Sequence, residues 1–143
     1  MRRIDSVIEN LEIEFSRKLK GLKDILIPLA IKTAEHILRA EIHIDPKVVE
    51  KQIEKALEII DNEKIFKIRL NPADIEILKM LNSKFIFEPK LKEAKIIQDP
   101  NVDKGGCIIE TEVGRIDARI LSQLAKIETS LKNYPFSFGT QDV

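Results

Sequence analysis

The sequence predicts an α+β fold, in which a long N-terminal helix leads into a small domain with a sheet of three or four strands covered by helices on one face. Three observations support this prediction. Apolar residues recur every three or four positions through the first 40 residues. Period-two alternation replaces this helical spacing in IFKIRL, at residues 65–70, and returns twice later. Proline follows Asp45 and Asn71, a pairing typical of helix starts.

The first segment is predicted to be a helix from about Arg3 to about Ala40, with a narrow apolar stripe in its first half. The stripe contains six candidate interface residues: Ile4, Ile8, Leu11, Phe15, Leu19 and Leu22. Charged residues fill the other positions, a pattern more typical of a coiled-coil seam than of a core helix. We therefore predict an amphipathic coiled-coil helix at 1–24, an α+β domain at 25–134 and a flexible tail at 135–143. Pro28 predicts a kink within this helix. The alternative is one bent helix that lies entirely within the globular domain.

A second helix is predicted to begin at Pro46, with Asp45 as its N-cap, and to continue to about Ile60. In the strand at residues 65–70, alternation places Phe66, Ile68 and Leu70 on one face. Asn71 then caps a short helix that ends near residue 81.

Two clear strands are predicted in the second half, at residues 94–98 and 107–113, after an ambiguous stretch at residues 85–91. The turn-forming residues between the two strands predict that they pair as a hairpin. In the second strand, Cys107 and Val113 share the apolar face. After Gly114, Asp117 is predicted to cap a last helix that ends near Asn133.

Catalytic and metal-binding patterns are weak throughout the sequence. Lys104-Gly105-Gly106 precedes a strand, whereas a phosphate-binding loop precedes a helix. Glu41, His43 and Asp45 would share one side only in an extended chain, and a surface connection explains them better. We expect Cys107 to be a buried, inert thiol. We expect the neighbouring pair of strand carboxylates, Glu110 and Glu112, to be solvated without perturbed pKa values. The sequence therefore predicts no enzyme activity, no metal and no cofactor.

Composition restricts the partners and the compartment. The formal net charge is zero, with 24 basic and 24 acidic residues, so no global charge favours nucleic acid or an anionic membrane. No apolar run is long enough for a membrane span, so direct membrane insertion is not expected. The single cysteine fits a reducing, cytoplasmic location. The residues alone predict a module that binds other polypeptides through helix packing.

Three stretches carry a resemblance to a known family: Ile27–Leu57, Ile68–Leu78 and Ile96–Leu131. The last of them, IIQDPNVDKGGCIIETEVGRIDARILSQLAKIETSL, is the most specific. In these stretches the sequence resembles the C-terminal domain of the FliH family, over about Leu22 to Leu131. The type III secretion stators (SctL/YscL) share the pattern, and the E-type stalk protein of V/A-type ATPases is more distantly similar. The motif from Gly114 to Ala118 favours the secretion families over the rotary ATPases.

The resemblance implies a stator protein of flagellar assembly or type III protein export. Such a protein forms a homodimer, binds and negatively regulates the export ATPase (FliI/SctN-like) through that enzyme's N-terminal segment, and links it to the secretion apparatus. An export-gate or C-ring protein is a further expected partner. The protein would then lie in the cytoplasm, peripherally associated with the export apparatus at the inner membrane. The alternative is a peripheral-stalk protein, of the E type, in a V/A-type rotary ATPase. Family members usually carry a longer N-terminal region with small-residue helix repeats, so contacts made by that region are not assumed.

Overall fold

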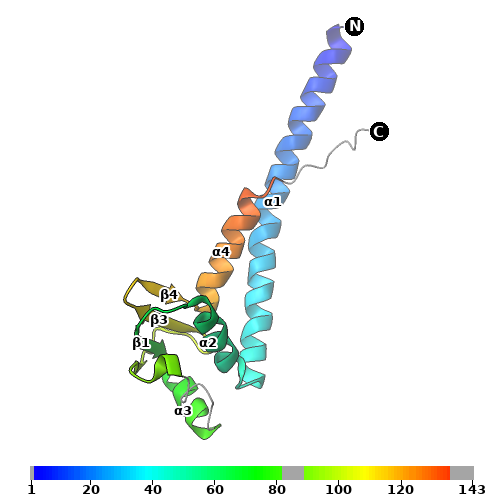
Figure 1. Cartoon of the computed structure of the whole chain (residues 1–143). Coiled ribbons are helices and arrows are strands. Elements are labelled where there is room, and N and C mark those ends of the chain that lie inside the picture. The colour runs from blue at the N-terminus through cyan, green and yellow to red at the C-terminus, as the bar shows by residue number, and fades with distance from the viewer. Residues whose placement is uncertain (1, 82–88, 136–143) are drawn as a thin grey trace. The chain divides into compact units, whose positions relative to one another are not determined.

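The computed structural model describes residues 2–81 and 89–135 and confirms the α+β fold (Figure 1). Its elements are α1 (Arg2–Ile44), α2 (Val48–Ile59), β1 (Ile65–Leu70), α3 (Pro72–Met80), η2 (Pro89–Leu91), β2 (Lys95–Gln98), β3 (Cys107–Thr111), β4 (Arg115–Asp117) and α4 (Ile120–Asn133). The chain forms two compact units. One contains the first part of α1 with the end of α4, and the other comprises residues 35–125 with the sheet.

Helix α1 is longer than predicted, because it continues four residues past Ala40 to Ile44. It runs through both Gly21 and Pro28, so neither residue ends it. A proline in a helix leaves one carbonyl without its N–H partner, and the predicted kink at Pro28 stays a prediction. The extension also makes Glu41 and His43 helical. The extended arrangement in which they could have shared one side with Asp45 is therefore absent.

The four-stranded sheet has the order β2-β1-β3-β4, which contradicts the predicted hairpin. Strand β1 pairs in parallel with β2 and antiparallel with β3, so it separates the two strands that were expected to be neighbours. The loop between them crosses the end of β1, where the Asp99 N–H donates to the Leu70 carbonyl at 2.8 Å. The fourth strand, β4, was not predicted, and it pairs antiparallel with β3.

Strand β1 contains a bulge that shifts its predicted alternation. The register changes between Ile65 and Lys67 opposite β3, so Ile65 is buried and Phe66 is 45% exposed. Ile68 and Leu70 are fully buried, as predicted. The placement of Phe66 on the core face was therefore wrong, because the extra residue of a bulge reverses the faces of the residues before it.

Helices α2 and α3 cover one face of the sheet and form the core with it. The buried cluster comprises Val49, Ile53, Ala56, Leu57 and Ile60 near α2, Ile75 and Leu78 from α3, Ile65, Ile68, Leu70, Cys107 and Ile109 from the strands, and Leu91 and Ala118. The opposite face of the sheet carries mostly charged residues, with the buried Ile108 among them.

Of the three predicted helix caps, one is confirmed and two need correction. Asn71 caps α3 as expected, because its side chain accepts a hydrogen bond from the Ala73 N–H at 2.9 Å. Asp45 does not cap α2. It accepts from the Lys47 N–H at 2.9 Å in a turn, and the helix begins only at Val48. Asp117 is the last residue of β4, three positions before α4 begins.

Strand β3 ends at Thr111, two residues before the predicted end. Thr111 and Gly114 close a tight turn, in which the Thr111 N–H donates to the Gly114 carbonyl at 2.7 Å. Val113 lies in this turn and is 74% exposed, so it does not share the buried face of Cys107. Of the ambiguous stretch at 85–91, residues 89–91 form a 3₁₀ turn, while residues 85–88 and the predicted tail from residue 136 onward lie outside the described residues.

Candidate functional site

The candidate site is the α1 stripe, which we define as the six predicted interface residues on one side of helix α1. These are Ile4, Ile8, Leu11, Phe15, Leu19 and Leu22. Because α1 is continuous, residues three and four positions apart fall on the same face. All of them except Leu19 are exposed, and Leu19 is half-buried. The structure thus places the six residues along one side of a single helix.

Other apolar residues extend the α1 stripe. Val7 lies between its first members and was missed by the sequence analysis, although its position fits the same helical face. Ile25, Leu26 and Leu29 continue the stripe toward the middle of α1 and are exposed as well. In this part of α1, Ile27 is buried, whereas these three residues are not.

The surface around Leu11 and Phe15 is apolar at its centre and charged at its edges. Leu11 is 63% exposed and Phe15 is 61% exposed, and together they line an open depression of about 470 Å³. Glu12, Glu14 and Lys18 line it too. A contiguous apolar surface with a polar rim is typical of a site that another protein covers.

The chain already uses the other side of α1. Ile27, only 7% exposed, lies about 140° around the helix from Leu22 at 100° per residue. Nearby, the Lys23 ammonium donates to the carbonyl of Lys132 at 2.7 Å and to that of Tyr134 at 3.1 Å. Helix α1 therefore has one apolar face that packs within the chain and a second that does not.

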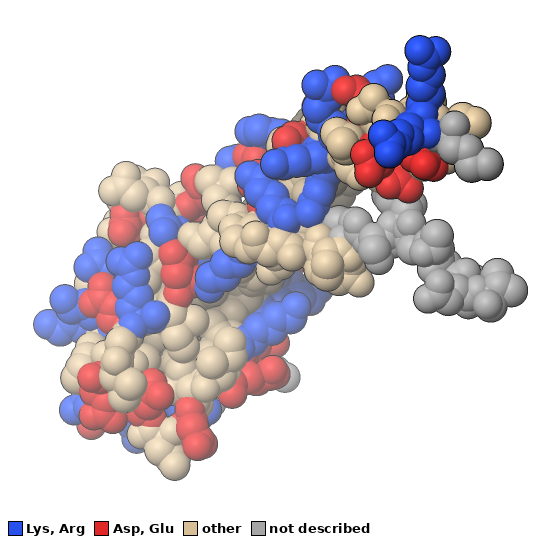
Figure 2. All heavy atoms as spheres, turned by 90° about the horizontal axis from the view of Figure 1, so that it is seen from above, with Lys and Arg blue, Asp and Glu red and all other residues tan. Residues whose placement is uncertain are grey.

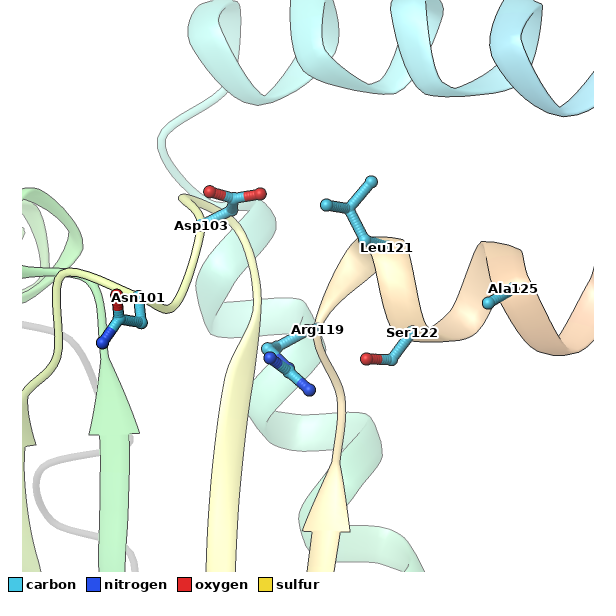
Figure 3. A pocket seen from close by; sticks show the side chains of 6 residues that line it. All are labelled: Asn101, Asp103, Arg119, Leu121, Ser122 and Ala125. Atoms are coloured by element: carbon cyan, nitrogen blue, oxygen red, sulfur yellow. The ribbon is translucent and has the colours of Figure 1, made fainter.

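A small polar pocket of about 230 Å³ lies where the loop before β3 meets the start of α4 (Figure 3). It is lined by Asn101, Asp103, Arg119, Leu121, Ser122 and Ala125. Beside it, the Arg119 guanidinium donates to both carboxylate oxygens of Asp117, at 2.9 and 2.6 Å, and the Ser122 hydroxyl donates at 2.9 Å. These bonds hold the pKa of Asp117 well below its usual range. A carboxylate with its oxygens engaged in this way fixes the start of α4 and is poorly placed to act as a base.

Two buried side chains are of types that often take part in catalysis, and neither is placed to do so. Cys107 is fully buried, and burial raises the pKa of its thiol to about 12, so it is a poor nucleophile. The prediction of a buried thiol is confirmed. Asp74 is 4% exposed, and burial raises its pKa, while its carboxylate accepts from the Gly105 N–H at 2.8 Å. Asp74 thus holds the loop before β3 in place.

Of the two strand carboxylates, Glu112 is exposed, as predicted, whereas Glu110 differs from its prediction. Glu110 accepts from the Arg69 guanidinium at 2.8 Å, and this bond lowers the pKa of Glu110. The expectation that nothing beside Glu110 perturbs its pKa was therefore wrong, because the neighbouring strand places an arginine opposite it. The other carboxylate, Glu112, follows β3 and accepts from the Lys64 backbone N–H at 3.1 Å. Within residues 2–81 and 89–135, no group of three or more His, Cys, Asp or Glu side chains could hold a metal ion.

With this geometry in place, comparison with known proteins identifies the family. The family model described as "Flagellar assembly protein FliH" matches residues 1–127. The chain belongs to the FliH family. The match includes the α1 stripe, which the sequence analysis had placed ahead of the resembling region that began near Leu22. The first half of α1 is thus part of what this chain shares with the FliH family.

Curated relatives carry the same description or a related one. The chain is 34% identical over 135 residues to the flagellar assembly protein FliH of Borreliella burgdorferi, an alignment that covers 94% of this chain and 44% of that protein. It is 31% identical over 80 residues to the type 3 secretion system stator proteins of Yersinia pestis and Yersinia pseudotuberculosis, covering 55% of this chain and 36% of each. The chain therefore spans less than half the length of these relatives. In the described part of the chain, no helix is both long and apolar enough to cross a membrane.

Proposed function

We propose that this chain acts as a non-catalytic stator protein of flagellar assembly or type III protein export. In this role it binds the export ATPase, lowers its ATP hydrolysis before assembly and links it to the export apparatus in the cytoplasm, at the inner membrane. The match to the FliH family supports the flagellar and secretion role. The Yersinia relatives support the same role, because they are named as stator proteins of a type 3 secretion system.

The single structural observation that carries the proposal is the exposed α1 stripe. A stator must hold other polypeptides rather than transform a small molecule, and the stripe offers a surface suited to that task. We propose that the stripe pairs with the same stripe of a second copy, so that the protein is a homodimer. The six residues of the stripe make a short seam, and isolated helices are marginal in water, so the rest of the chain should contribute to the dimer.

Co-purification with the candidate export ATPase tests the proposed function. The full chain is mixed with the flagellar-type ATPase of the same organism, and complex formation and ATP turnover are both measured. We expect a stable complex with a lower rate of ATP hydrolysis than the free ATPase shows. The absence of a complex, or a complex that leaves the rate unchanged, would contradict the proposal.

A second arm of this experiment addresses the rotary-ATPase alternative. The same chain is mixed with the A and B subunits of a V/A-type ATPase under identical conditions. We expect no complex with these subunits. Selective binding to them, with none to the export ATPase, would favour a peripheral-stalk role instead.

A further inference from the structure

The sheet face opposite the core carries two rows of side chains that cross all four strands. Residues paired directly across neighbouring strands point to the same face, and the core takes Ile68 and Ile109 on the other face. The register gives one row as Lys95, Lys67, Glu110 and Arg115, and the next as Ile97, Arg69, Ile108 and Asp117. We call the first of these the basic row.

The carboxylates of this face are already paired with arginines. Arg69 donates to Glu110 at 2.8 Å and lies 3.6 Å from Asp99, and Arg119 pairs with Asp117. The cations of the basic row are Lys67, Lys95 and Arg115. None of the three takes part in an ion pair within the described residues. Lys95 and Arg115 are exposed and Lys67 is half-buried. The basic row therefore presents three cations, while its one carboxylate already binds Arg69.

The fold gives Lys67 one neighbour of opposite charge, Glu110 on β3, and one of like charge, Lys95 on β2. Lys67 and Lys95 are register partners on paired strands, where like charges repel each other and destabilise the sheet. A lysine on an edge strand can protect that edge from pairing with other chains, which accounts for Lys95 on β2. Lys67, however, is on β1, which pairs with neighbours on both sides. A binding partner that supplies negative charge would relieve this repulsion.

We propose that the basic row is a docking surface for an acidic segment of the export ATPase. This inference rests on the proposed function. Three inter-strand steps of about 4.8 Å separate Lys95 from Arg115, so the row spans about 14 Å. Four residues of an extended segment cover about the same length, so two or three carboxylates of one short segment can meet the three cations. Ile97, which is half-buried in the adjacent row, offers apolar contact beside the charges.

The charge pattern of the rest of the chain favours a polypeptide over nucleic acid. Figure 2 shows acidic and basic side chains interspersed over the face in view, and the chain has no net charge. Nucleic-acid binding surfaces carry an extended basic patch that follows many phosphates. Three cations in one row, interrupted by Glu110, suit a short segment with a few carboxylates better.

Neutralisation of the row tests this inference. The row variant combines Lys67→Gln, Lys95→Gln and Arg115→Gln in the full chain. The matched control combines Lys47→Gln, Lys55→Gln and Lys92→Gln, three exposed lysines away from the row that remove the same total charge. Affinity for the export ATPase of the same organism is measured at low and at physiological salt. Urea unfolding midpoints confirm that both variants stay folded.

We expect the row variant to bind the ATPase about tenfold more weakly than the wild type, with an affinity that depends less on salt. We expect the control variant to keep the affinity and the salt dependence of the wild type. Equal affinity of the row variant and the wild type would overturn the inference and leave the proposed function intact. An equal loss in both variants would also overturn it, because only total charge would then matter. If the wild type does not bind the ATPase, the proposed function fails and this inference fails with it. Binding of the wild type to a duplex oligonucleotide, lost in the row variant, would assign the row to nucleic acid instead.

Discussion

Gly105 is a residue at which the loop before β3 depends on the absence of a side chain. Its φ of 85° lies in the left-handed region, which L-residues with a Cβ rarely adopt. A Cβ at this position would lie 2.9 Å from the Ile42 side chain. The Gly105 N–H also donates to Asp74, so the loop is held from two sides. A substitution at Gly105 should therefore disturb the whole loop.

We predict that Gly105→Ala lowers the free energy of unfolding by about 1–3 kcal/mol, through the left-handed backbone and the contact with Ile42. Urea denaturation measures this change. Gly114→Ala is the control, because no atom lies within 4 Å of the Cβ it would add, and we expect it to change stability by less than about 0.5 kcal/mol. Similar stabilities for the two variants would show that the loop does not hold Gly105 as described.

At the scale of elements, the start of α4 depends on Asp117. Its carboxylate accepts from the Arg119 backbone N–H at 3.1 Å as well as from the side chains of Arg119 and Ser122. One side chain thus joins the end of β4 to the start of the last helix. Charge-assisted bonds of this kind are stronger than those between neutral groups.

We predict that Asp117→Asn lowers the free energy of unfolding by about 1–2 kcal/mol at neutral pH. The pKa of Asp117 is lowered in the folded state, so below about pH 4 the unfolded chain binds more protons and the stabilisation is lost as the pH falls. The difference in the free energy of unfolding between the wild type and the variant should therefore decrease from about pH 5 toward about pH 3. Urea titrations across this range measure it, and a difference that stays constant would show that the charge of Asp117 is not what stabilises α4.

Most elements were predictable from local chemistry, whereas their pairing was not. Asn71-Pro72 places the start of α3 correctly, because the cap and the proline act within one helical turn. The bulge that exposes Phe66 depends on the register with β3, which leaves no trace in the spacing of β1. The prediction of a hairpin was wrong for the same reason, because turn-forming residues at 99–106 do not reveal that β1 lies between β2 and β3.

The two candidate binding surfaces differ in the same way, because one depends on local structure and the other on strand pairing. The α1 stripe was predictable because a single long helix fixes which residues share a face, whatever the rest of the fold does. The basic row was not, because it joins residues from four strands whose order only the structure provides. Glu110 shows the difference well, since its partner Arg69 lies 41 positions away in the chain.

At the scale of the whole molecule, the proposed homodimer depends on the two faces of α1. One face is used within the chain, where Ile27 is buried and Lys23 bonds to the carbonyls of Lys132 and Tyr134. The other carries the α1 stripe, whose apolar surface is largely exposed to water from Ile4 to Leu22. Exposed apolar surface of this extent is costly to maintain unless another chain covers it.

Light scattering of the full chain at low micromolar concentration, with single aspartate substitutions on α1, is the most direct test of this claim. Ile8→Asp and Phe15→Asp place a charge in the α1 stripe, whereas Ile13→Asp places the same charge on an equally exposed residue of another face. We predict a dimeric mass for the wild type and for Ile13→Asp, and a mass shifted toward the monomer for the two stripe variants, with unchanged circular dichroism. A monomeric wild type, or stripe variants that remain as dimeric as Ile13→Asp, would contradict the account.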